Sequence, residues 1–247
     1  MTIHESLWHG FPDFDALINK LEQMRSQIGT EYDRLFQIIP NCSRKDAKVT
    51  TIANLGKLID STNLAFTFIT KHLLPFDNFW WKEIHKPPFS NFDNYHKSLT
   101  VHNFNSGLLK VGFVQGLFSI FDSRFRIFLR ELDPEVSEYA TYSFYNIHKD
   151  LKDKITFPAN SDELLKLLRL VRNTVHNNGV YFDKHRNNEQ IIYKGKTYDF
   201  HHGQPVKFVH WEWLIDRFEE AQQLLIQIVN DPRIISIPTE ITERVRN

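Results

Sequence analysis

The chain has 247 residues, which is enough for one large domain or two small ones with a buried core. Thirty basic residues balance thirty acidic ones, so the overall charge gives no indication of nucleic-acid or membrane binding, although a local basic patch remains compatible with it. Phenylalanine is frequent, at 21 residues, which argues against disorder and favours an aromatic core or a large partner surface.

The single cysteine, Cys42, cannot form an internal disulfide, which is typical of a reducing compartment. The first residues lack a basic region followed by an apolar run, so they do not resemble a signal peptide. We see no run of about twenty apolar residues, the length that a membrane-spanning helix needs. We therefore expect a cytosolic protein without membrane contact.

Apolar residues at helical spacing predict a helix over residues 11–39 and a second over 44–74, which Gly56 could weaken or divide. Residues 75–103 have no period and hold three prolines among many aromatic residues. We expect an ordered loop with short helical turns, held to the bundle by its rings. The alternative is that Trp80 and Trp81 stack on nucleic-acid bases beside nearby lysines.

Residues 104–132 are apolar on most sides and predict a central helix. Asp133 and the proline after it predict the cap and first turn of another helix that ends near Lys152. Asn160 with Glu163 predicts the start of a helix over residues 161–177.

After Gly179 the pattern changes from helical to extended. The stretch "EQIIYKGKTYDF" predicts two strands around a turn at Lys194 and Gly195, and "QPVKFVHW" could add a third strand. A last helix should follow and end near Pro232. The fold class is therefore mainly α, a helical bundle with a small β-hairpin insertion at about 189–209 before the last helix.

We expect three regions along the chain. Residues 1–103 form an N-terminal helical region with the aromatic-rich loop, and residues 104–232 form a helical bundle with the hairpin. Residues 233–247 are polar, and we expect a loose tail.

The stretch "RLVRNTVHNNGVYF" places basic and amide side chains at the end of a leucine-rich helix. Arg169, Arg172 and His176 share one helix face because they are three and seven residues apart. Asn173 and Asn177 form a second pair on a neighbouring face, and the glycine at 179 suits a left-handed helix end. On spacing alone, the favoured interpretation is a cap, since cations stabilise the negative end of a helix dipole.

The stretch "LLRLVRNTVHNNG" resembles the motif of the HEPN superfamily (higher eukaryotes and prokaryotes nucleotide-binding domain). In that family an arginine precedes a histidine by four to six intervening residues near the end of a helix. Arg169 fits this spacing, whereas Arg172 carries the "RN" dipeptide but leaves three intervening residues. The tyrosine of HEPN toxins that pair with a nucleotidyltransferase is replaced here by Asn178, so that pairing is not expected.

The resemblance implies a helical, dimeric, metal-independent endoribonuclease without a cofactor, in a toxin or phage-defence setting. RNA would be the substrate, and an antitoxin or another regulatory protein would be a partner. His176 would be the acid–base catalyst, Arg169 or Arg172 would bind the phosphate, and Asn173 or Asn177 would position these groups.

The chemistry is sound for these residue types. Histidine titrates near neutral pH and can exchange a proton with the ribose 2′-hydroxyl, while arginine stays charged and binds phosphate with two donors. Lys184, His185 and Arg186 follow the motif closely. If the motif binds RNA, they are the residues that would most readily add phosphate contacts; otherwise they form a solvated turn.

Three alternatives stay open. A HEPN-like module without catalysis would bind RNA, a nucleotide or a protein partner, and an unrelated helical scaffold would use the cluster only as a cap. Twelve histidines also raise the question of a metal site around Asp199, His201, His202 and His210. Neighbouring residues on a strand point to opposite faces, and no zinc motif is present, so we expect no metal.

Overall fold

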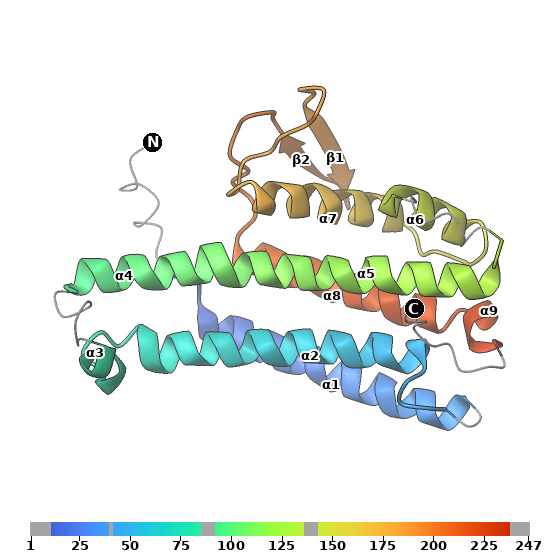
Figure 1. Ribbon diagram of the computed structural model, residues 1–247, viewed down its shortest axis with the longest axis horizontal. Helices are drawn as coiled ribbons and strands as arrows, with labels where there is room; N and C mark the ends of the chain where they lie inside the picture. Colours follow the sequence, from blue (N-terminus) through green and yellow to red (C-terminus); the bar gives the residue numbers. More distant parts are fainter. Residues whose placement is uncertain (1–10, 40–41, 85–91, 136–142, 238–247) are drawn as a thin grey trace, which may run out of the picture.

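The computed structural model describes residues 11–39, 42–84, 92–135 and 143–237. Within them the protein is a helical bundle with one two-stranded antiparallel sheet (Figure 1), which confirms the prediction of a mainly helical protein with a small β-hairpin. The elements are α1 (Phe14–Ile38), α2 (Ala47–Phe68), η1 (Ile69–Leu73), α3 (Phe79–Ile84), α4 (Asn94–His102), η2 (Asn103–Leu109), α5 (Lys110–Leu132), α6 (Phe144–Lys152), α7 (Ser161–His176), β1 (Glu189–Tyr193), β2 (Lys196–Phe200), α8 (Trp211–Val229) and α9 (Pro232–Ile235).

One long helix, residues Asn94–Leu132, runs through the middle of the bundle. It joins α4, the π-helical segment η2 and α5, and Figure 1 shows α5 between α2 on one side and α7 on the other. The predicted central position is correct because the phenylalanines of the stripe, such as Phe121, Phe125 and Phe128, are buried. Residue 103, where we placed a regional boundary, lies inside this helix, and the buried residues on both sides of it belong to one core.

By length and composition, this helix could also cross a membrane, since an 18-residue window has a mean hydropathy of 1.2. Of that window, 39% is buried inside the protein. The core helix of a soluble protein has the same properties, and α5 packs here against α2, α6 and α7. The cytosolic location stays a prediction.

Helices α1 and α2 pack against each other along one side of α5 (Figure 1). Each begins at an aspartate whose carboxylate accepts a backbone N–H, Asp13 from Ala16 and Asp46 from Lys48. Gly56 does not divide α2. A Cβ atom at this position would lie 3.3 Å from Cγ2 of Ile28, so the missing side chain allows α1 to approach closely.

The aromatic segment after α2 is ordered where the structure describes it, as predicted. It contains α3 and α4, whereas residues 85–91 lie outside the described residues. Trp81 is buried, and its indole N–H donates to the carbonyl of Leu73 at 2.9 Å. Trp80 packs edge-on against Phe68 with ring centroids 5.2 Å apart. Packing on the bundle therefore accounts for these rings without a nucleic-acid ligand.

Helix α7 begins at Ser161, as predicted, whereas the helix predicted to follow Asp133 falls largely on residues outside the described ones. Asp133 ends α5: its N–H donates to the carbonyl of Leu129, and its carboxylate pairs with Lys154 at 2.6 Å. Pro134 and Glu135 form a turn. Helix α6 begins at Phe144, and Ser143 is its cap; the residues between 136 and 142 lie outside the described ones. Asn160 adopts a left-handed backbone (φ 63°) and makes no capping bond through its side chain, so it does not form a cap pair with Glu163.

The hairpin forms where the sequence places it. Lys194 and Gly195 both have positive φ, as a tight two-residue hairpin turn requires, and strands β1 and β2 pair in the register Tyr193↔Lys196. The predicted third strand does not form. Residues 204–211 instead contribute one isolated bridge, in which Pro205 pairs with Val180.

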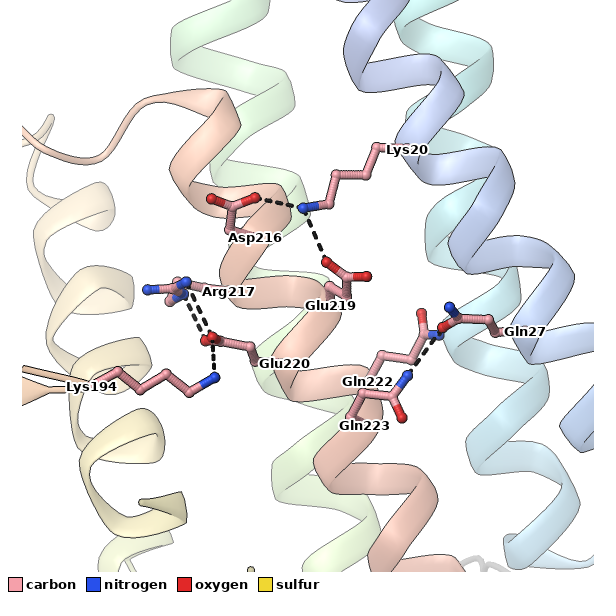
Figure 2. A network of polar contacts seen from close by, with 9 residues as sticks. All are labelled: Lys20, Gln27, Lys194, Asp216, Arg217, Glu219, Glu220, Gln222 and Gln223. Atoms are coloured by element: carbon pink, nitrogen blue, oxygen red, sulfur yellow. Dashed lines mark hydrogen bonds and ion pairs between the residues drawn. The ribbon is translucent and has the colours of Figure 1, made fainter. Parts of the chain in front are cut away.

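Polar contacts from α8 attach both the hairpin and α1 to the bundle (Figure 2). On one side, Glu220 accepts hydrogen bonds from Lys194 at 2.6 Å, from Arg217 and from the hydroxyl of Tyr193 at 3.0 Å. Burial and the Glu220 carboxylate raise the pKa of Tyr193. The other side faces α1, where Lys20 lies 2.6 Å from Asp216. These bonds attach the hairpin to α8, and β1 also contacts α7.

The chain beyond residue 232 is not all loose. Residues Pro232–Ile235 form α9, capped by Asp231, and Ile234 is fully buried. The expectation of a loose tail from residue 233 is thus wrong for the start of this region. Residues 238–247 lie outside the described residues.

Candidate functional site at the end of α7

Helix α7 ends at His176, one residue before the predicted end. Asn178 (φ 54°) and Gly179 (φ 84°) then turn the chain through left-handed conformations. The N–H groups of Asn177 and Gly179 both donate to the carbonyl of Thr174 at 3.0 Å, which satisfies that carbonyl at the helix end. The predicted left-handed stop at Gly179 is therefore confirmed.

His176 is exposed, and it makes no hydrogen bond or ion pair with any residue that the structure describes. The two asparagines of the motif are exposed as well. The side-chain amide of Asn177 donates to the backbone carbonyl of Asn173 at 2.9 Å, so one of them helps to cap the helix. The imidazole stays accessible to a ligand or to a second subunit.

Arg172 is held against the neighbouring helix α5. Its guanidinium carbon lies 4.7 Å from the ring centroid of Phe118, within the range of a cation–π interaction. Its Nε atom donates a long hydrogen bond of 3.4 Å to Oε1 of Gln115. Arg172 is half-buried and has a structural role in this state.

Arg169 has different surroundings. It lines a hollow with a volume of about 600 Å³ between α6, α7 and the start of β1. It makes no hydrogen bond or ion pair with the described residues, although its charge lowers the pKa of Tyr181, which burial raises overall. His176 is not among the residues that line this hollow. The two candidate arginines are thus divided between a helix interface and an open, charged hollow.

The other walls of this hollow were not identified from the sequence. Helix α6 contributes an aromatic and basic face, and α7 contributes the face that ends in Arg169. A helical period in residues 144–152 was the available signal, but the sequence does not reveal which face of α6 would meet α7. The lining residues are Phe144, Tyr145, His148, Lys149, Lys152, Asp162, Leu165, Lys166, Arg169 and Glu189.

His148 lies at the inner side of the hollow, between aromatic rings. Its ring is stacked on Phe144 at 6.4 Å and contacts the edge of Phe157 at 5.1 Å. Nε2 lies 3.3 Å from Oδ1 of Asp162, but the angles are not those of a hydrogen bond. Burial lowers the pKa of His148, while the charge of Asp162 opposes this shift and that of Lys152 adds to it. The neutral imidazole is therefore favoured.

The predicted additional RNA contacts lie in an exposed turn that follows α7. The carboxylate of Asp183 accepts the backbone N–H groups of Asn187 and His185, and these bonds lower its pKa. Lys184, His185 and Arg186 are all exposed in this turn, which leaves their side chains open to solvent.

The histidines around the hairpin have structural contacts. Nδ1 of His202 accepts the backbone N–H of Asp183 at 3.1 Å, and Nδ1 of His210 caps α8 by accepting the N–H of Trp213. In the part of the chain that the structure describes, no three His, Cys, Asp or Glu side chains gather closely enough to hold a metal ion.

Neither a scan of protein-family models nor searches of curated proteins and of solved structures finds a match to this chain. The resemblance to the HEPN superfamily therefore depends on the α7 residues and on the helical surroundings of α7.

Proposed function

We propose that the protein is a HEPN-like, metal-independent endoribonuclease that acts as a homodimer. The observation that supports this proposal is the position of His176. Its imidazole is exposed at the end of α7, without an intramolecular partner among the described residues, one helical turn after Arg172. A cap or scaffold would instead hold the imidazole inside the bundle or against carbonyl groups of its own chain.

In the proposed reaction, the 2′-oxygen of a ribose attacks the adjacent phosphorus atom. The imidazole of His176 takes the proton of this hydroxyl, and the bond from phosphorus to the 5′-oxygen breaks. The departing 5′-oxygen receives a proton from the imidazolium of the second subunit, which leaves a 2′,3′-cyclic phosphate and a 5′-hydroxyl end. A twofold axis brings identical residues of two copies together, which accounts for the need for a dimer.

An arginine stabilises the negative charge that builds up on the phosphate oxygens. Arg169 is available for this role without loss of an existing contact, whereas Arg172 would have to leave the Phe118 ring or act from its present place. Asn173 is exposed and can donate to a phosphate oxygen or orient the imidazole. The toxin or defence setting, the regulatory protein partner and the cytoplasmic location follow only from the resemblance and from composition.

A second candidate is a HEPN-like module that binds RNA without cleaving it. The contact of Arg172 with Phe118 and Gln115 favours this alternative, because it engages the arginine nearest to His176 in the fold.

The test is incubation of purified protein with end-labelled RNA in the presence of EDTA. We expect cleavage by the wild type and by His201→Ala, a control that removes another exposed histidine, and none by His176→Ala. Equal cleavage by all three proteins would contradict the proposal. RNA binding without cleavage by the wild type would support the second candidate.

A further inference from the structure

The hollow between α6, α7 and β1 has the size of a small-molecule site. Its volume of about 600 Å³ lies within the range of about 300–1,000 Å³ that is usual for ligand pockets. Tyr145 and Lys149 are four residues apart on α6, so they share a face of this helix. Lys166 and Arg169 are three residues apart on α7 and also share a helix face. Leu165 adds an apolar surface to the lining of the hollow.

The charges of the hollow leave two cations available. Lys152 pairs with Asp162, and Lys166 pairs with Glu189 at 2.9 Å, so both carboxylates already have a basic partner. Lys149 and Arg169 form no hydrogen bond or ion pair with the described residues. Each of these two side chains comes from a different helix, and both line the same space. An anion with about two negative charges would complement them.

One aromatic ring is also available. Tyr145 is 60% exposed and has no ring contact among the described residues, in contrast to Phe144, which packs against Phe118 and Phe125. An exposed ring next to basic groups is the arrangement on which proteins stack nucleic-acid bases.

We propose that this hollow binds a nucleotide that carries a terminal phosphate monoester, with the phosphate between Lys149 and Arg169 and the base against Tyr145. A monoester carries about −1.5 to −2 charges at neutral pH, which matches the two cations that have no partner among the described residues. An internal phosphodiester carries one charge and matches them less well.

Two sources offer the same chemistry: a free nucleoside monophosphate and the 5′-phosphorylated end of an RNA. The second source rests on the proposed function with Arg172 at the scissile phosphate, because Arg169 in the hollow would then hold the RNA end; the first source does not rest on it. The binding measurement below uses no cleavage readout, so a failed nuclease proposal and a failed binding proposal are distinguishable.

The test is titration of the full chain, in EDTA, with AMP, with adenosine and with a short RNA that bears either a 5′-phosphate or a 5′-hydroxyl. The RNA carries 2′-O-methyl groups so that cleavage is blocked. Isothermal calorimetry follows the free nucleotides, and fluorescence anisotropy follows the RNA. We expect saturable binding that is at least about tenfold tighter with the phosphate than without it, because charge-assisted hydrogen bonds are lost with the phosphate.

The variants identify the site. Arg169→Ala and Lys149→Ala should each weaken monophosphate binding by about tenfold or more. Tyr145→Ala should weaken it, and Tyr145→Phe, which keeps the ring, should not. Lys71→Ala removes one exposed positive charge far along the chain in η1 and controls for net charge.

Equal affinity for AMP and adenosine, or unchanged binding by both Arg169→Ala and Lys149→Ala, would overturn the proposal. So would the absence of saturable binding of every phosphorylated probe. Tighter binding of the 5′-phosphorylated RNA than of AMP supports the site with an RNA end as its occupant, and the reverse order supports it with a free nucleotide. His176→Ala should bind like the wild type, which separates this site from the proposed catalytic histidine.

Discussion

The two arginines of the motif should contribute very differently to stability. Arg172 stacks on the ring of Phe118 at 4.7 Å and donates a long bond to Gln115. A half-buried cation–π contact contributes about 0.5–1 kcal/mol, and a weak hydrogen bond adds about 0.5 kcal/mol. Arg172→Ala should therefore lower the free energy of unfolding by about 1–1.5 kcal/mol. For a chain of this length that is a fall of about 2–6 °C in melting temperature.

Arg169→Ala is the matched control, since this arginine makes no ring contact, hydrogen bond or ion pair with the described residues. It should change the free energy of unfolding by no more than about 0.5 kcal/mol, as other surface substitutions do. Circular dichroism at increasing temperature or denaturant concentration measures both variants.

A double-mutant cycle isolates the ring contact. In a Phe118→Leu background, Arg172→Ala should cost about 0.5 kcal/mol or less, because the ring that it stacks on is gone. A larger loss of stability in Arg169→Ala than in Arg172→Ala would refute the division of roles between the two arginines. An unchanged cost of Arg172→Ala in the Phe118→Leu background would refute the cation–π explanation.

Three further predictions test the fold. Burial lowers the pKa of His148 below its value in the unfolded chain, so the unfolded state binds more protons. The free energy of unfolding should therefore fall as the pH drops below about 6.5. In denaturant unfolding at several pH values, His148→Gln should lose less stability between pH 7.5 and 5.5 than the wild type. Asn105→Leu removes the acceptor of the buried Trp211 N–H (2.8 Å) and should cost about 1–3 kcal/mol in denaturant unfolding, with part of this recovered when Trp211→Phe is added. Gly56→Val should cost about 1–3 kcal/mol by crowding α1, whereas Gly112→Ala, where a Cβ meets nothing within 4 Å, should raise the melting temperature through helix propensity.

The sequence predicted the elements whose formation depends on local pattern. The apolar stripe of α5 needs burial on several sides, and its phenylalanines are buried as expected. The hairpin turn at Lys194 and Gly195 depends on two adjacent residues that adopt positive φ. The end of α7 likewise depends on Asn178 and Gly179, which can adopt left-handed backbone without a partner from elsewhere in the chain.

The predictions were wrong where contacts with residues distant in the sequence determine the local structure. Residues 204–211 have the composition of a strand, yet Pro205 forms only one bridge with Val180 after the end of α7. Ile234 lies just after the predicted end of the last helix, and its burial under the bundle orders α9.

The candidate site was predicted in part for the same reason. The helical period places Arg169, Arg172 and His176 on one face of α7, and the Asn-Asn-Gly sequence indicates the end of the helix to within one residue. The helical period does not show that Arg172 packs against Phe118 of α5, or that Arg169 lines a hollow together with α6. These neighbours come from separate parts of the chain.

The central claim is that His176 transfers the proton in metal-independent RNA cleavage. The most direct measurement is mass spectrometry of the fragment ends after incubation of wild type and His176→Ala with a defined RNA and EDTA, beside the same RNA with a 2′-deoxy residue at the cleaved position. The account predicts 2′,3′-cyclic phosphate and 5′-hydroxyl ends from the wild type alone, and none from the deoxy substrate. Intact RNA after incubation with the wild type, or the same fragments from both proteins, would contradict it.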